Sequence, residues 1–194
     1  MKRQLIQFGV IIGVLLLCAG GYFLMTNYFA DKKAEEEKAD TTQAFKIDDY
    51  TKITGITYSY NDEMIILLKE GDKWILGENN EADLDESIIE QEMLIQLSQI
   101  NSETVIENPK NIADYGFEKD KEGNITAETT TIIAMDSSDK AYTIYIGASN
   151  PYDTAKYYMM VENDDNVYVI DSTIVDTFSR SATDLEVVEE TTTE

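Results

Sequence analysis

Residues 53–76, ITGITYSYNDEMIILLKEGDKWIL, decide the class of fold. Three runs rich in β-branched and aromatic residues are separated by Asn61-Asp62 and by Glu70-Gly71-Asp72, which are typical of tight turns between antiparallel strands. The stretch therefore predicts an antiparallel meander. Its strands are expected at residues 53–60, 64–69 and 73–76. Trp74, the only tryptophan, lies in the last short strand and is expected to anchor the core.

A helix is predicted directly after the meander. Asp83 is a good N-cap residue, and Glu86 three residues later completes a capping-box pattern. Apolar residues then recur at helical steps of 4, 4 and 3, at Ile89, Met93, Leu97 and Ile100. The pattern predicts an amphipathic helix over 83–100 that lies across a sheet.

The second half of the chain repeats this order of elements. Strands are expected at 103–107, 129–135, 141–146, 156–161 and 167–170, with one helical turn at 111–115 that stops at Gly116. Asp171-Ser172 caps a short helix through Phe178. The fold class is therefore α+β, a mostly antiparallel sheet with one main amphipathic helix and one short C-terminal helix. Both halves run strand, turn, strand and capped helix, which suggests a duplicated β-β-α unit.

The N-terminal segment predicts a membrane anchor. Leu5 to Met25 holds one polar side chain, Gln7, and is long enough to cross a hydrocarbon core of about 30 Å. Lys2 and Arg3 precede it, so the positive-inside rule places the N-terminus in the cytoplasm and the domain outside. Cleavage of this segment as a signal peptide, or lipidation of Cys18, remains an alternative.

This anchor gives the chain five parts. They are a cytoplasmic stub at 1–4, a transmembrane helix at 5–28, an acidic linker at 29–45, an extracytoplasmic α+β domain at 46–180 and a disordered acidic tail at 181–194. The linker and tail are acidic and carry few large apolar residues. Gly9 and Gly13 form a small-xxx-small pair through which two anchors could pack, but the oligomeric state stays open.

Composition limits the chemistry of the domain. Beyond residue 30 the chain holds 13 basic residues against 38 acids, a balance of −25, which disfavours binding to nucleic acid. The sequence has no histidine, and its one cysteine, Cys18, lies inside the apolar segment. Ser-His-Asp triads, Cys-His pairs and His-ligated zinc are therefore excluded. We expect a binding protein, not an enzyme, with no cofactor and no catalytic or metal-ligating residue.

Two weaker hypotheses remain for the acidic residues. Glu118, Asp120, Glu122 and Gly123 occupy places 1, 3, 5 and 6 of an EF-hand-like loop, but place 12 is Thr129 where a bidentate Glu is required. A solvated turn is the simpler interpretation, and a divalent-cation or glycan binding module is the alternative. An acid-only hydrolase is a distant alternative, which would need a deep cleft with two carboxylates about 5–10 Å apart.

Contact with a partner is expected at two loops of the second half. They are residues 148–155 and 162–166. Tyr152 is the best candidate contact residue because a tyrosine in a loop offers apolar area with a polar tip.

Several short motifs follow one another along the chain: Trp74, the capped helix 83–100, Asp114-Tyr115-Gly116-Phe117, Ile146-Gly147, Tyr157-Tyr158 and Val167-Tyr168-Val169-Ile170. Their order resembles that in a known family, the bacterial domain of unknown function 4340. One departure is the polar insertion Lys119–Gly123, where family members often have a proline. The resemblance covers about residues 50–180. It implies a membrane-anchored envelope protein of unknown activity, whose relatives are often associated with ABC-type transporters of the gliding-motility kind. It implies no catalytic residues.

Overall fold

The computed structural model describes residues 41–77 and 82–187, which belong to one compact unit, Thr41–Glu194. The predicted stub 1–4, the predicted transmembrane helix 5–28 and linker residues 29–40 lie outside the described residues. None of the helices in the described part has the length and apolar character needed to span a membrane.

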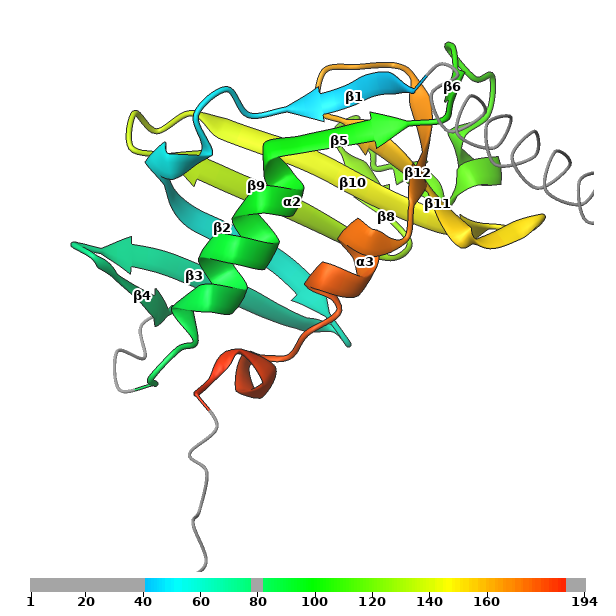
Figure 1. The fold of residues 1–194 in the computed structure, drawn as a ribbon. Helices are drawn as coiled ribbons and strands as arrows, with labels where there is room; N and C mark the ends of the chain where they lie inside the picture. The colour runs from blue at the N-terminus through cyan, green and yellow to red at the C-terminus, as the bar shows by residue number, and fades with distance from the viewer. Residues whose placement is uncertain (1–40, 78–81, 188–194) are drawn as a thin grey trace, which may run out of the picture. The chain divides into compact units, whose positions relative to one another are not determined.

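An eight-stranded antiparallel sheet forms the centre of the unit, in the order β4-β3-β2-β9-β10-β11-β12-β6 (Figure 1). The predicted meander is confirmed, and its first strand has the predicted bounds. The strands are β2 (Ile53–Tyr60), β3 (Glu63–Glu70), β4 (Lys73–Leu76), β6 (Thr104–Ile106), β9 (Thr130–Asp136), β10 (Ala141–Asn150), β11 (Asp153–Val161) and β12 (Val167–Asp171). The chain is therefore a mostly antiparallel sheet with few helices.

The two faces of this sheet carry different cores. Directly paired residues share a face, and Leu67 on β3, Ile56 on β2 and Ala134 on β9 lie in one such row. All three are buried in the larger core, on the face that we call inner. Tyr158 on β11 and Val169 on β12 are paired on the opposite, outer face and belong to a second, smaller core.

Helices and a small two-stranded sheet cover the inner face. In Figure 1 they lie in front of the strands. They are η2 (Ile88–Met93), α2 (Leu94–Ser98) and α3 (Thr173–Phe178), with strands β1 (Thr42–Lys46) and β5 (Gln99–Ser102) and the short helices η1 (Tyr50–Lys52) and η4 (Ala182–Leu185). The apolar stripe predicted at Ile89, Met93 and Leu97 is confirmed, because all three side chains are buried in the larger core.

The predicted bounds of the main helix, 83–100, are wrong at both ends. Its cap is Asp85, whose carboxylate accepts a hydrogen bond from the Ser87 amide at 2.9 Å. Asp83 and Leu84 cannot start a helix because they pair with residues 185–187 as a short extended bridge. Ile100 lies in β5, opposite Phe45 of β1, and so fills the core from a strand.

That bridge also corrects the predicted tail. Residues 181–187 are not disordered, since Leu185 in η4 is fully buried and the Val187 amide donates to the Asp83 carbonyl at 2.9 Å. Residues 188–194 lie outside the described residues. The predicted linker 29–45 is wrong for residues 42–45, which belong to β1 because Phe45 is buried in the larger core.

The main helix is π-helical over Ile88–Met93. The Leu94 amide donates to the Ile89 carbonyl five residues back, so one additional residue fits in this turn. The carboxylate of Glu90 accepts from Lys69 Nζ at 2.8 Å and from Trp74 Nε1 at 3.2 Å. These two hydrogen bonds tie the helix to β3 and β4 and lower the pKa of Glu90.

The lowered pKa of Glu90 predicts a pH-dependent contribution to stability. A carboxyl group whose pKa is lower in the folded state stabilises the fold above its unfolded pKa, and this contribution is lost as the pH falls through the folded pKa. Replacing Glu90 by glutamine should therefore cost at most about 1 kcal/mol at pH 7, since the pair with Lys69 is partly exposed. Urea titrations at pH 7 and at pH 3 should show that the difference from the native chain shrinks in acid. A constant difference would refute this role.

Candidate functional site

A lobe of residues 107–128 covers one part of the outer face. It contains the helical turn η3 (Ile112–Tyr115) and the hairpin β7 (Phe117–Lys119) and β8 (Ile125–Ala127). Phe117 is fully buried and packs with Tyr158 and Met160 of β11 and with Val167 and Val169 of β12. The lobe is therefore a third layer, placed behind the sheet in the view of Figure 1.

Two glycines hold the lobe against β10. A Cβ atom on Gly116 would lie 2.2 Å from the backbone nitrogen of Ala148, and one on Gly147 would lie 2.2 Å from the Tyr115 carbonyl oxygen. Gly116 also has a φ of +82°, which closes η3 in a left-handed cap. The two backbones therefore touch without side chains between them. The predicted turn at 111–115 and its stop at Gly116 are confirmed.

Hydrogen bonds complete this junction. The Glu128 amide donates to the Gly116 carbonyl at 2.9 Å, and the Thr129 amide donates to the Ile146 carbonyl at 3.0 Å. Thr129 Oγ1 donates to the Gly147 carbonyl at 2.6 Å. Thr129 thus fixes the entry into β9, which explains its position better than a place in a calcium loop.

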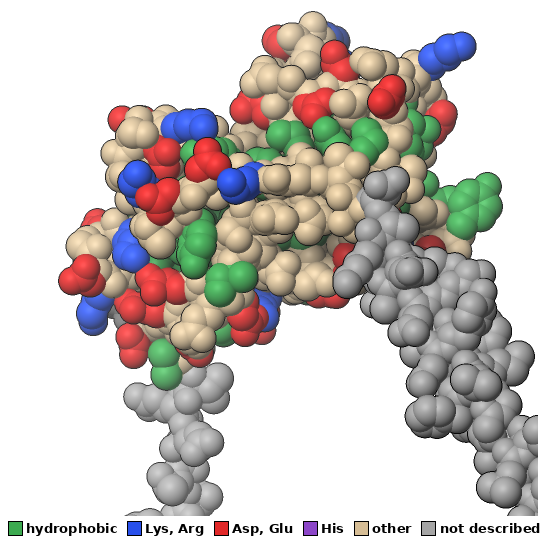
Figure 2. All heavy atoms as spheres, turned by 45° about the horizontal axis from the view of Figure 1, so that its top comes forward, with side chains coloured by type: hydrophobic (Ala, Val, Ile, Leu, Met, Phe, Trp, Pro, Cys, Tyr) green, Lys and Arg blue, Asp and Glu red, His purple; other side chains and the backbone are tan. Residues whose placement is uncertain are grey.

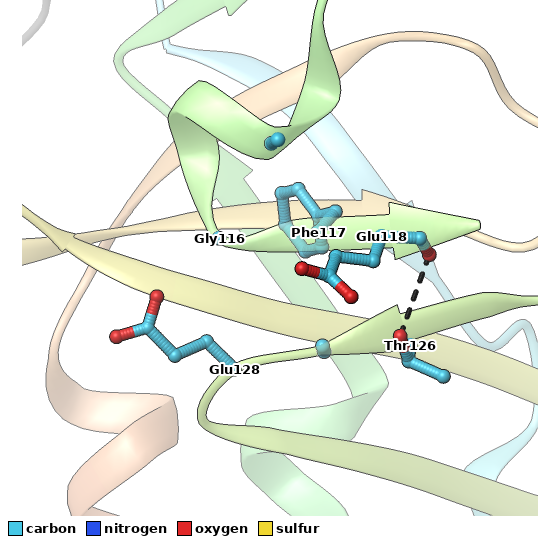
Figure 3. Close-up of a pocket in the computed structure, with 7 residues that line it drawn as sticks. Gly116, Phe117, Glu118, Thr126 and Glu128 are labelled. Carbon is cyan, nitrogen blue, oxygen red and sulfur yellow. Dashed lines mark hydrogen bonds between the residues drawn. The ribbon is translucent and has the colours of Figure 1, made fainter. Parts of the chain in front are cut away.

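A hollow opens beside the junction, between η3 and the hairpin. It has a volume of about 300 Å³ and continues into a second hollow of about 490 Å³ along residues 109–112. Figure 3 shows the carboxylates of Glu118 and Glu128 on different segments, with that of Glu118 extending below Phe117 and that of Glu128 turned away from Glu118. Both side chains are exposed. The first hollow is lined by Ala113, Gly116, Phe117, Glu118, Thr126, Ala127 and Glu128.

Three tyrosines lie in or next to this lobe. The rings of Tyr115 on η3 and Tyr158 on β11 meet edge to face with centroids 5.0 Å apart. Burial raises the pKa of Tyr158, with smaller contributions from Tyr115 and Tyr152. Tyr152 occupies the two-residue turn between β10 and β11 and is 96% exposed. The prediction of a loop at 148–155 is correct only for residues 151–152. Residues 148–150 belong to β10 and residues 153–155 belong to β11.

The second predicted contact loop, residues 162–166, is a turn in which the carboxylate of Asp164 accepts hydrogen bonds from within the domain. Asp164 Oδ2 accepts from the Tyr168 hydroxyl at 2.5 Å, and its Oδ1 accepts from the Asn166 amide at 3.0 Å. Asn166 Oδ1 in turn accepts from the Asn108 amide at 3.3 Å, where the lobe begins. This turn therefore supports the lobe and offers less free surface than the Tyr152 turn.

The EF-hand-like residues form a hairpin turn. The Asp120 carboxylate accepts from the amides of Glu122 and Asn124 at 2.9 and 2.8 Å and from the Asn124 side chain at 2.8 Å. These bonds lower the pKa of Asp120. Within residues 41–77 and 82–187 no three His, Cys, Asp or Glu side chains converge as a metal site would require. The polar insertion Lys119–Gly123 is thus the tip of β7-β8, an element that the sequence did not predict.

Comparison with known proteins identifies the family. A family model described as a domain of unknown function, DUF4340, matches residues 74–187. The chain belongs to this family. The matched segment of the DUF4340 chain runs from Trp74 of β4 to the bridge at residues 185–187, and it includes the lobe and both junction glycines. No curated protein and no solved structure matches the chain.

Proposed function

We propose that this DUF4340 protein is a non-enzymatic binding protein of the cell envelope, held in the membrane by helix 5–28 with its N-terminus in the cytoplasm. The observation that carries the proposal is the lobe and its neighbouring turn. The glycine junction fixes the lobe on the sheet, and beside it Tyr152 is presented almost fully exposed. A large side chain on a short two-residue turn is typical of a contact residue, since a tight turn has little conformational freedom to lose on binding.

The exposed carboxylates favour binding over hydrolysis. An acid-only hydrolase needs one carboxyl group kept protonated by a buried, apolar setting. Glu118 and Glu128 both face solvent at the hollow. The hollow is therefore better suited to bind a cationic or hydrogen-bonding group of a partner than to act as the acid and base pair of a hydrolase.

A membrane protein is the partner that we propose, with an ABC-type transporter as the first candidate. Membership of the DUF4340 family supports this proposal, because the family that the sequence motifs resemble is often associated with such transporters. The anchor would hold the domain next to other membrane proteins, where a modest affinity is enough for association because the effective concentration is high.

The sheet also supports the proposed duplication. β2 and β9 are antiparallel neighbours at the centre, and each starts a meander that runs outward in the opposite direction. Each meander leads to a helix on the inner face, η2-α2 in the first half and α3 in the second. The meanders have three strands (β2–β4) and four strands (β9–β12), so a duplicated β-β-α unit accounts for part of each half.

Replacing Tyr152 by alanine should abolish co-purification of the membrane partner without affecting the fold. The full-length chain would be purified from membranes after mild crosslinking, and the captured proteins would be identified. We expect transporter subunits with the native chain and with Tyr152→Phe, which keeps the ring, and a loss of at least about tenfold with Tyr152→Ala. An unchanged set of partners in the alanine variant would refute the role of this turn.

A further inference from the structure

The outer face of the sheet is only partly covered. The lobe packs on β11 and β12, whereas large apolar side chains on β3 and β9 remain exposed in the described part of the chain. Met64, Ile66 and Leu68 alternate along β3 and are 68, 36 and 41% exposed, and Met135 on β9 is 43% exposed. Of the exposed large hydrophobic side chains in the described residues, only Ile95, Tyr152 and Val187 lie elsewhere.

The strand register brings these side chains into one surface, which we call the open face. Leu68 is paired with Gly55 on β2, and Gly55 with Met135. Ile66 is paired with Thr57, and Thr57 with Ile133. A Cβ atom on Gly55 would lie 3.6 Å from Leu68 and 3.8 Å from Met135, so these two side chains close over the glycine and make the row continuous.

Charge is distributed around the open face and not on it. The residues that form it, Gly55, Thr57, Met64, Ile66, Leu68, Ile133 and Met135, are all uncharged. The turns that border it, residues 61–63, 70–73 and 136–140, carry six carboxylates against two lysines. Depletion of charge at the centre with a charged rim is typical of protein interfaces. Figure 2, which views another side of the molecule, shows acidic and basic side chains intermixed with uncharged surface.

The size of the open face limits its occupant. Three strands about 4.8 Å apart and four residue steps of about 3.4 Å span roughly 10 Å by 14 Å between backbone positions, a patch of about 140 Å². A stable dimer needs about 800 Å² per partner. Two copies of a chain with net charge −23 would also repel each other. A single α-helix of three turns, about 16 Å long and 10 Å wide, fits this patch.

We propose that the open face binds an amphipathic α-helix of a partner protein whose apolar side is flanked by lysine or arginine. The apolar side chains of that helix lie on Met64, Ile66, Leu68 and Met135, and its cationic side chains meet the acidic turns. This is helix-in-groove recognition without a deep groove, so a moderate affinity is expected. The surface is separate from the Tyr152 turn, and the inference does not depend on the proposed function.

A model peptide tests the proposal on the full-length chain. The probe is a fluorescein-labelled 14-residue peptide of leucine and lysine with leucines at helical spacing, compared with a scrambled peptide of the same composition. The M64S/I66T/L68T variant should bind the helical peptide at least about tenfold more weakly than the native chain. The matched control Ile95→Thr, on α2, should bind it as the native chain does. The scrambled peptide should bind native and triple-variant chains equally weakly.

Several results would overturn the proposal. One is unchanged peptide binding by the triple variant, and another is equal binding of the helical and scrambled peptides. Self-association that the triple variant abolishes in sedimentation would assign the open face to a second copy. Binding to neutral phosphatidylcholine vesicles that the triple variant abolishes would assign it to lipid. Fluorescence of Trp74 checks that the triple variant is folded. If the triple variant is not folded, the single variant Ile66→Lys replaces it and is expected to weaken binding to the cationic peptide.

Discussion

Replacing Gly147 by alanine is expected to lower the free energy of unfolding by about 3 kcal/mol or more, the largest effect that we predict for a single methyl group. The added Cβ would lie 2.2 Å from the Tyr115 carbonyl oxygen and 2.7 Å from the ring of Phe117. Both neighbours are held in place, one by the backbone of η3 and one by the outer core. Neither can move without separating the lobe from β10. Urea-induced unfolding followed by the fluorescence of Trp74 measures the change.

Two other glycines provide controls for this prediction. Gly71 has a positive φ, +63°, unlike Gly147, but nothing lies within 4 Å of its added Cβ, so Gly71→Ala should cost only the backbone strain of about 1 kcal/mol. Gly55→Ala in β2 adds an ordinary van der Waals contact and should be neutral or slightly stabilising. If Gly147→Ala costs no more than Gly71→Ala, the close contact between the lobe and β10 is wrong.

Replacing Phe117 by alanine should cost about 3–5 kcal/mol and release the lobe from the sheet. Phe117 is fully buried and is the central side chain of the outer core, so its removal leaves a cavity between β7 and β11. Phe117→Leu keeps most of the volume and should cost about 1–2 kcal/mol. Hydrogen exchange locates the effect, because local opening exposes only the amides that the lobe protects.

The amides of Glu128 and Thr129 are the most informative reporters of this release. They donate to Gly116 and Ile146 at the junction. In Phe117→Ala their exchange should accelerate more than that of amides in β2 and β3, which belong to the inner core. A uniform acceleration over both regions would mean that the lobe and the sheet unfold as one unit.

Sequence patterns predicted the elements whose contacts are local. Asn61-Asp62 and Glu70-Gly71-Asp72 placed the meander, because the residues that form each tight turn are neighbours in the chain. The cap at Asp171 was also correct, since its carboxylate accepts from the Thr173 amide two residues on, at 3.0 Å.

Elements that depend on distant partners were missed. β1 forms only because residues 42–46 pair with residues 99–102, and Asp83 loses its role as a cap because residues 185–187 pair beside it. A capping-box pattern does not contain this information. The sequence signal for the main helix was real, but its first turn was displaced to Asp85 by a bridge from the opposite end of the domain.

Individual residues of the candidate site could be predicted from the sequence, but the contacts between them could not. Gly116 and Gly147 each belonged to a short motif that resembled the family, yet nothing in either motif indicated that they touch. Tyr152 was placed in a loop, and it lies in the exposed turn between β10 and β11. The hollow beside Glu118 and Glu128 was missed, because β7 and β8 are three-residue strands on either side of a segment that was interpreted as a polar insertion.

Site-specific photocrosslinking in intact cells tests the central claim, that an anchored domain binds a membrane partner through the Tyr152 turn. A photoreactive amino acid would replace Tyr152 in the full-length chain, with Ile95, an exposed residue of α2, as the matched control position. We predict an adduct with a membrane protein, such as a transporter subunit, from position 152 and not from position 95. No adduct from either position, or the same adducts from both, would contradict the account.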